Sequence, residues 1–206
     1  MLSAAAGLLL GFLIHAQLVA AGFWQALDTA VLHAIARWHG PVRDAWVMAL
    51  TDLGHEQGVI PLTVVLVIVL AIRRQVLPAV FVVVAMAGAG GVNALVKHLV
   101  QRQRPALWQP LTHETTWSFP SGHAMGAVAL AVVLTLLAWP GRWRWPVLLA
   151  GGLFALLAGL SRLYLGVHWP SDIIGAWLLA PAWVLAVHAC MPRQGRRDLC
   201  RSADIS

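Results

Sequence analysis

The sequence has few charged residues and few cysteines. Only 11% of its 206 residues are Asp, Glu, Lys or Arg, whereas 60% are hydrophobic, against roughly 45–50% in a soluble domain. This composition argues against a soluble globular domain. The two cysteines, Cys190 and Cys200, stand near the C-terminus without zinc-ligand spacing, so we expect neither a metal site nor a structural disulfide from them.

Long apolar runs with almost no charge make up most of the chain. A helix that crosses a bilayer needs ~20 apolar residues, and six runs approach this length. They cover about Leu2–Ala21, Gly58–Ile72, Val76–Val96, Ala124–Trp139, Pro146–Leu160 and Ile173–Cys190. We therefore predict an all-α polytopic membrane protein, a six-transmembrane-helix bundle. No internal repeat or linker divides the chain, so one domain over residues 1–206 suffices.

The first run has no lysine or arginine before it. A cleaved signal peptide normally begins with a positively charged region, so we interpret the run as a retained span. The sequence Val19-Ala20-Ala21 does offer a cleavage site, and a cleaved leader is the alternative.

The segment Phe23–Gln57, between the first two spans, has mixed polarity. Its apolar residues recur at helical spacing at Leu27, Val31, Ile35 and Trp38. The pattern favours a short amphipathic helical segment at the membrane surface, or an ordinary packed loop helix.

Positive charge exceeds negative charge, with a formal net charge of +6. The basic residues lie between apolar runs and in the tail, so we expect no nucleic-acid partner. Cytoplasmic loops carry the excess of Lys and Arg, and an even number of spans puts both termini on one side. That side holds Arg73, Arg74, Arg142, Arg144, Arg193, Arg196, Arg197 and Arg201.

Both termini are therefore predicted to be cytoplasmic. The opposite, extracytoplasmic side holds six cations, and its later loops keep their charge against the rule, so these charges need another explanation. They are Arg37, Arg43, Lys97, Arg102, Arg104 and Arg162.

The first polar cluster on that side contains Lys97 and Arg104-Pro105. The two cations are seven positions apart, so both point from one face if the helix of the third span continues this far. Two cations on one face repel each other unless an anion lies between them. A basic flank that holds lipid headgroups is the alternative explanation.

The second cluster is Pro120-Ser121-Gly122-His123, directly before the fourth span. Free backbone N–H groups at a helix start form a site for phosphate. In a purely structural interpretation, Ser121 is an N-cap and His123 an interfacial side chain.

The third cluster contains Ser161-Arg162, His168 and Asp172, with Pro170 suited to the first turn of a helix. At a spacing of four, the Asp172 carboxylate could hold one imidazole N–H of His168 and aim the other nitrogen outward. Such a pair alone is more often structural. All three clusters fall on one face, however, and together they fit a dianionic phosphate with a labile ester bond.

Few carboxylates accompany these clusters. Asp172 is the one acid within them and Glu114 is the nearest other acid, so we expect no metal and no cofactor. The apolar spans also contain almost no ionisable groups, which argues against the alternative of a transporter that grips a lipid headgroup.

Together the three motifs resemble the signature of the type 2 phosphatidic acid phosphatases, whose superfamily includes the vanadium haloperoxidases. The matched parts are Lys97-(six residues)-Arg104-Pro105, Pro120-Ser121-Gly122-His123, and Ser161-Arg162-(five residues)-His168-(three residues)-Asp172. The small size and six spans are similar to the bacterial phosphatidylglycerophosphatase B and undecaprenyl pyrophosphate phosphatase subgroups. The resemblance implies a lipid phosphatase of the bacterial cytoplasmic membrane with its active site on the extracytoplasmic face.

The resemblance also implies a role for each matched residue. His168 attacks phosphorus, Asp172 orients His168, and His123 protonates the leaving group; the residues alone did not decide which histidine attacks. The phosphate-binding positions are Lys97, Arg104, Ser121, Gly122 and Arg162. The implied substrate is a lipid phosphate or lipid pyrophosphate such as undecaprenyl pyrophosphate, phosphatidylglycerophosphate or phosphatidate, and phosphoryl transfer to another acceptor is the alternative to hydrolysis.

Overall fold

The structure is a computed structural model that describes residues 1–54, 57–112, 114–139 and 141–192. Within these residues it consists of eight α-helices and contains no β-strand. The helices are α1 (Leu2–Ala20), α2 (Gln25–Ala36), α3 (Pro41–Leu53), α4 (Val59–Ile72), α5 (Val76–Val100), α6 (Gly122–Ala138), α7 (Arg144–Tyr164) and α8 (Pro170–Cys190). The prediction of an all-α membrane fold is confirmed.

Each of the six predicted spans corresponds to one helix, namely α1 and α4 to α8. Four of them, α1, α5, α7 and α8, are long and apolar enough to cross a membrane. The apolar helices α4 and α6 are shorter, with 14 and 17 residues. The count of six spans is therefore not confirmed by helix length.

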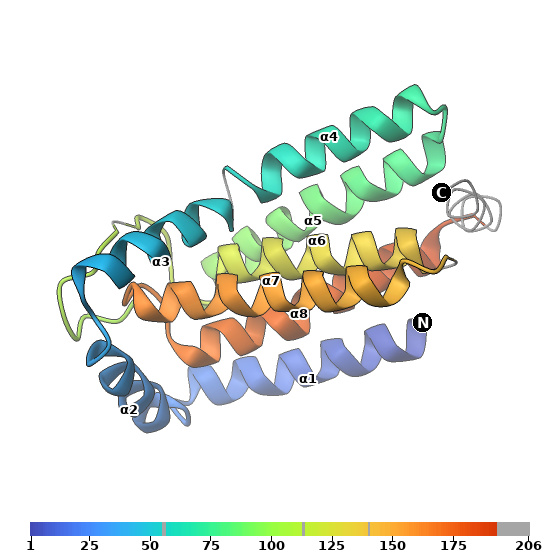
Figure 1. Ribbon diagram of the computed structural model, residues 1–206. Helices are drawn as coiled ribbons and strands as arrows, with labels where there is room; N and C mark the ends of the chain where they lie inside the picture. Colours follow the sequence, from blue (N-terminus) through green and yellow to red (C-terminus); the bar gives the residue numbers. More distant parts are fainter. Residues whose placement is uncertain (55–56, 113, 140, 193–206) are drawn as a thin grey trace.

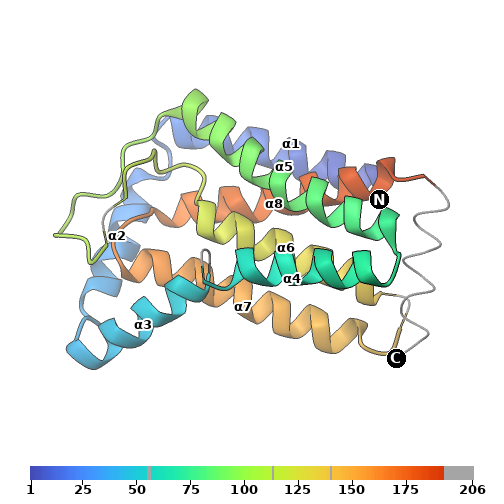
Figure 2. The same ribbon diagram turned by 90° about the horizontal axis from the view of Figure 1, so that it is seen from above.

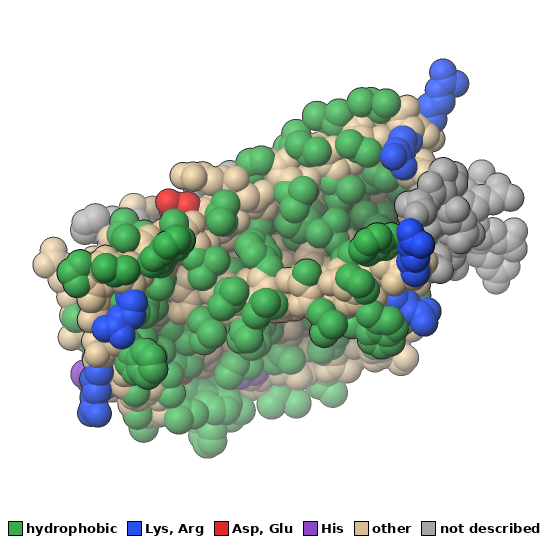
Figure 3. Space-filling model, in the orientation of Figure 1, with side chains coloured by type: hydrophobic (Ala, Val, Ile, Leu, Met, Phe, Trp, Pro, Cys, Tyr) green, Lys and Arg blue, Asp and Glu red, His purple; other side chains and the backbone are tan. Residues whose placement is uncertain are grey.

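The centre of the bundle is α6, which packs against α4, α5, α7 and α8, while α1 packs along α8 (Figures 1 and 2). Small residues allow this close approach, since Ala124, Ala127 and Ala129 of α6 are fully buried. In contrast, the outer helix α4 exposes most of its Val, Ile and Leu side chains. Figure 3 shows a lateral surface covered by hydrophobic side chains, with Lys and Arg gathered at its two ends. This distribution suits a protein surrounded by lipid.

The segment between the first two spans forms two helices rather than one amphipathic segment. Pro41 at the first position of α3 explains the break, because proline cannot continue α2 but fits the first turn of a new helix. Within the predicted apolar stripe, Leu27 and Trp38 are exposed, whereas the neighbouring Asp28 and Leu32 are buried.

Helices α2 and α3 lie at the end of the bundle opposite the start of α1 and the end of α8 (Figure 1). Residues 101–112 and 114–121, from the connection between α5 and α6, fold over the same end (Figures 1 and 2). The turn from α7 to α8 lies there as well. Gly166 in this turn has φ +73, and a Cβ at this position would lie 2.7 Å from the Trp108 side chain, so the turn requires glycine. This turn places His168 at the same end of the bundle.

Candidate active site

A polar cavity of about 510 Å³ opens at this end of the bundle. Residues from all three sequence motifs line it, so the fold brings together clusters that are far apart in the chain. Its lining comprises Thr51, Asp52, Gln57, Asn93, Lys97, Thr112, Glu114, Thr116, Gly122, His123, Arg162 and His168. Of the other predicted site residues, Arg104 and Asp172 contact His168, and Ser121 begins α6 beside the cavity.

His168 and Asp172 form a buried pair at the start of α8. Asp172 is the third residue of the helix and accepts a hydrogen bond from the backbone N–H of Trp169 (2.9 Å), which fixes the carboxylate. Its Oδ2 lies 3.3 Å from Nδ1 of His168 and accepts from Ser118 Oγ at 2.5 Å. The imidazole therefore donates from Nδ1 and presents Nε2 as the lone-pair nitrogen, 3.2 Å from Arg104 Nη1.

Burial keeps His168 neutral. The side chain is 1% exposed, and loss of solvent lowers its pKa from 6.5 to about 4, although Asp172 acts in the opposite direction. A neutral imidazole with an oriented lone pair is a nucleophile or a base.

Lys97 and Arg104 converge, but not in the way the sequence indicated. Helix α5 ends at Val100 because Gln101 adopts a left-handed conformation (φ 49), so Arg104 lies in the following segment and not on the same helix face. Thr116 joins the two cations, since its hydroxyl accepts from Lys97 Nζ (2.8 Å) and Arg104 Nη2 (3.2 Å).

The rest of the Arg104 guanidinium is held by backbone carbonyls of Thr116 (2.7 Å) and Val167 (2.8 Å). Burial lowers the pKa of Arg104 from its ordinary value, with the carboxylates of Glu114 and Asp172 opposing this shift. A guanidinium stays charged at neutral pH, so Arg104 remains a fixed cation beside Nε2 of His168.

Arg162 comes from the last turn of α7 and is almost fully buried. Its Nη1 donates to Thr51 of α3 (2.7 Å) and its Nη2 to the carboxylate of Glu114. Glu114 also accepts from Arg104 Nη2 at 3.5 Å, so one carboxylate bridges two guanidinium groups inside the cavity. A carboxylate between two arginines occupies the kind of position that a phosphate takes.

Ser121 and Gly122 form the start of α6. Ser121 is the N-cap and accepts from the backbone N–H of Ala124 at 3.5 Å, as the structural interpretation expected. Gly122 and His123 follow in the first turn and line the cavity, so the positive end of the α6 dipole points toward it.

Several residues that hold this site were not found from the sequence. Ser118, Thr116 and Glu114 lie in the irregular segment before α6, where no periodicity marks them. Arg102 contacts Asp172, and Asp28 of α2 contacts Arg102, across 70 and 74 positions of the chain. The only sequence signal for Arg102 was its positive charge on the side where the topology disfavours one.

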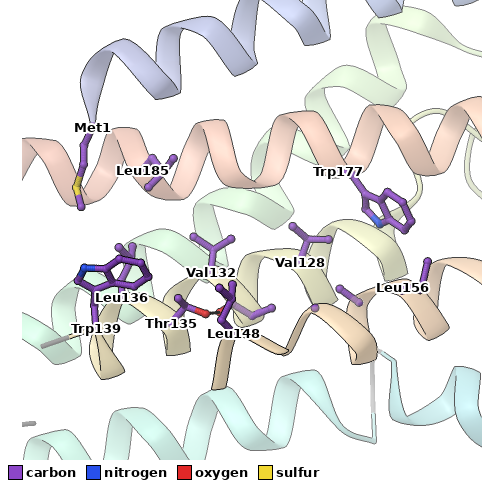
Figure 4. A pocket seen from close by; sticks show the side chains of 13 residues that line it. Met1, Val128, Val132, Thr135, Leu136, Trp139, Leu148, Leu156, Trp177 and Leu185 are labelled. Atoms are coloured by element: carbon purple, nitrogen blue, oxygen red, sulfur yellow. Dashed lines mark hydrogen bonds between the residues drawn. The ribbon is translucent and has the colours of Figure 1, made fainter. Parts of the chain in front are cut away.

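An apolar hollow of about 370 Å³ adjoins the polar cavity. It lies between α4, α5 and α6 and shares Asn93 and Gly122 with the cavity. Another apolar hollow, about 510 Å³ in volume, lies between α6, α7 and α8 and is lined by Val128, Val132, Leu148 and Leu156, among others (Figure 4). The second hollow shares no residue with the polar cavity, whereas the first gives that cavity an apolar extension.

Comparison with known proteins identifies the family of this chain. The profile of the PAP2 superfamily matches residues 78–196, which is more than half of the chain. The chain belongs to the PAP2 superfamily.

Relatives of this PAP2 chain are named lipid phosphatases. It is 29% identical to phosphatidylglycerophosphatase B of Bacillus subtilis, over 84% of this chain and 87% of the relative. It is 34% identical to undecaprenyl-diphosphatase of Sulfolobus acidocaldarius, over 66% of this chain and 64% of the relative. A crystal structure of a transmembrane PAP2-type phosphatidylglycerolphosphate phosphatase from Bacillus subtilis superposes with a TM-score of 0.82 and 28% identity, covering 90% of this chain and 94% of that one.

Proposed function

We propose that this PAP2 chain is a membrane lipid phosphatase that removes the terminal phosphate of a lipid phosphate or lipid pyrophosphate through a phosphohistidine at His168. One observation carries the proposal: a neutral, buried imidazole presents Nε2 beside Arg104 in a cavity that Lys97 and Arg162 also line. Phosphoryl transfer needs mainly positioning and charge stabilisation, and this set of residues supplies both.

In the first step, Nε2 of His168 attacks phosphorus. An N–P bond forms while the P–O bond to the leaving group breaks, and the leaving oxygen takes a proton from His123. Asp172 stabilises the positive charge that develops on the imidazole, since its carboxylate faces Nδ1. Lys97, Arg104, Arg162 and the start of α6 at Ser121 and Gly122 hold the phosphate oxygens.

In the second step, water attacks the phosphohistidine. His123 takes a proton from the water, the N–P bond breaks with its electron pair returning to Nε2, and inorganic phosphate leaves. The cations of the cavity perform the charge stabilisation in both steps, so the proposed mechanism requires no metal.

The lipid part of the substrate fits the neighbouring hollow. The apolar space between α4, α5 and α6 begins at Asn93 and Gly122, where the polar cavity ends. A phosphate in the cavity would therefore have its ester chain directed along apolar side chains toward the bilayer. The relatives named for phosphatidylglycerophosphate and undecaprenyl diphosphate support both substrate classes.

We also propose that α1 and α4 to α8 all cross the bacterial cytoplasmic membrane as one domain over residues 1–206, with both termini cytoplasmic and the cavity extracytoplasmic. The start of α1, the α4–α5 and α6–α7 connections and the end of α8 lie at one end (Figure 1). Arg73 and Arg74 lie in the first of these connections, Arg142 lies in the second, and Arg144 begins α7. The packing of α1 along α8 favours a retained first span over a cleaved leader.

The test is phosphate release from lipid phosphates in detergent micelles containing EDTA. The wild-type protein should turn over, vanadate should inhibit it, and His168→Ala should be inactive. The matched control is His98→Ala, since His98 is exposed beside Lys97 and does not line the cavity. Turnover by His168→Ala would exclude the phosphohistidine, and a strict need for Mg²⁺ would exclude metal independence.

Substrate preference requires a direct comparison on one preparation. Values of kcat/KM for undecaprenyl pyrophosphate, phosphatidylglycerophosphate and phosphatidate rank the candidates. Product analysis decides between water and another phosphoryl acceptor, since inorganic phosphate must equal the lipid consumed if water is the acceptor.

A further inference from the structure

A chain of buried charges extends from the proposed nucleophile to helix α2. The Oδ1 atom of Asp172 accepts from Nη1 of Arg102 at 2.6 Å, and the Oδ2 atom of Asp28 accepts from Nη2 of Arg102 at 2.7 Å. The two carboxylates are 0% and 1% exposed, and the Arg102 side chain is 11% exposed. Asp28 lies outside the three motifs of the family signature, and Arg102 occupies one of the unspecified positions between Lys97 and Arg104 in the first motif.

Both carboxylate oxygens of Asp28 accept hydrogen bonds. Its Oδ1 accepts from the backbone N–H of Ser171 at 3.0 Å, and its Oδ2 also accepts from the Ser171 hydroxyl. That hydroxyl accepts in turn from Arg102 Nη1 at 2.7 Å. Ser171 directly precedes Asp172, so Asp28 binds both the first turn of α8 and Arg102, the arginine that pairs with Asp172.

The burial of the Asp28 carboxylate in α2 needs a physical explanation. A buried charge is costly unless it is paired and fully hydrogen-bonded, and Asp28 meets that condition through groups that also contact Asp172 or its neighbour. The burial of Asp28 at a position where α2 could carry an apolar residue is therefore tied to the site.

The net charge of Asp28, Arg102 and Asp172 affects His168. Arg102 lies between two carboxylates, so it is shared, and the Asp28–Arg102–Asp172 group carries one net negative charge beside His168. Without Asp28, the full charge of Arg102 would neutralise Asp172, and Asp172 would stabilise a positively charged imidazole less well. The guanidinium would also lose the group that fixes its orientation, since Nη2 would have no carboxylate partner.

We propose that Asp28 is a positioning residue that acts through Arg102 to fix Asp172 and preserve its charge, and thereby supports His168 as nucleophile. The proposal rests on the proposed function of His168. Helix α2 lies outside the region matched by the family profile, and the proposal gives it a positioning residue for the reaction.

The experiment compares Asp28→Asn with the matched control Asp44→Asn, measured on purified protein with one lipid phosphate. Asp44 lies on α3 at the same end of the bundle, bonds to Tyr164 and His39, and has no contact with the cavity. Asp28→Asn should lower kcat roughly 10- to 100-fold, the range for loss of one hydrogen-bonding charge, with KM changed less than about threefold. Asp28→Glu should recover part of kcat, and Asp44→Asn should keep the wild-type kcat.

A double-mutant cycle tests the route through Arg102. If Asp28 acts through Arg102, then Asp28→Asn combined with Arg102→Gln should be no slower than Arg102→Gln alone. If the fold-losses of kcat in the two single variants multiply in the double variant, the proposal is overturned. A wild-type kcat for Asp28→Asn would also overturn it. If Asp28→Asn does not yield folded protein, Arg102→Gln decides by itself: a lowered kcat with unchanged KM supports the proposal and a wild-type kcat overturns it.

A purely structural role and a failed function give different results. A lower Tm for Asp28→Asn, together with a wild-type kcat per folded molecule, would show that Asp28 only stabilises the fold. A wild-type protein that releases no phosphate from any lipid phosphate would refute the proposed function itself. An active wild type, an inactive His168→Ala and a fully active Asp28→Asn would refute this inference alone.

Discussion

The protonation of His168 provides the sharpest test of the site. An ordinary histidine becomes protonated below pH 6.5, and a protonated imidazole cannot attack phosphorus. Burial lowers the pKa of His168 to about 4, so the nucleophile should remain available in mildly acidic solution. The difference is large at pH 5, where an imidazole with a pKa of 6.5 is about 3% neutral and one with a pKa of about 4 is about 90% neutral.

The same shift links protonation to stability. Because the folded-state pKa is below the unfolded value, the unfolded chain binds the proton first, and stability is lost as pH falls from about 6.5 through about 4. A difference of about 2.5 pKa units corresponds to roughly 3 kcal/mol for this one side chain. The thermal inactivation temperature should therefore fall over that interval, and fall less in His168→Gln, whose side chain does not titrate.

Direct titration by ¹⁵N NMR of histidine-labelled protein in micelles measures the pKa. The resonance that disappears in His168→Gln identifies the signal of His168. This signal should keep its neutral chemical shift at pH 5. A midpoint near 6.5 for His168 would refute the buried, carboxylate-paired geometry on which the mechanism depends. The substrate phosphate has its own ionisation near pH 6, so the NMR measurement is preferable to a pH–rate profile alone.

Three further substitutions test other parts of the site. Gly166→Ala should lower stability by about 1–2 kcal/mol and reduce kcat, because φ is +73 and a Cβ would meet Trp108, whereas Gly152→Ala in open space on α7 should be tolerated; equal Tm values for the two would contradict this. Glu114→Gln should tighten vanadate inhibition several-fold, because a negative charge between Arg104 and Arg162 is removed, and weaker inhibition would mean that Glu114 does not compete with the anion. Thr116→Val should raise KM roughly fivefold through loss of the hydroxyl that joins Lys97 and Arg104, while Thr135→Val, whose hydroxyl bonds only within α6, should leave KM unchanged.

The sequence predicted the helices and the motif residues because both signals are local. Apolar runs locate helices in a membrane protein, and His168 and Asp172 are only four positions apart, on either side of Pro170, which begins α8. By contrast, the position of Arg104 could not be predicted, because it depended on whether the helix of the third span continued that far. Nothing in the sequence around Gln101 marks a break before Pro105, yet Gln101 turns the chain and sends Arg104 into the loop.

The supporting residues could not be predicted because their partners are distant in the chain. His15 of α1 bonds to the backbone carbonyl of Ser171 at 2.8 Å, and Asp28 bonds to Ser171 and Arg102. Such contacts depend on how α1 and α2 pack against α8, which hydrophobic patterning leaves undefined.

Three of the six cations predicted for this end of the bundle are paired with carboxylates of the fold. Arg102 is shared between Asp28 and Asp172, and Arg104 and Arg162 share Glu114. Charge that is paired within the fold contributes little to the orientation of a membrane protein, so these arginines need not conflict with the excess at the opposite end. The pairing also leaves the two parts of the site with different roles. The carboxylates near Arg102 preserve negative charge close to His168, whereas we expect an anion in the cavity to displace Glu114 and to bind Arg104 and Arg162 in its place.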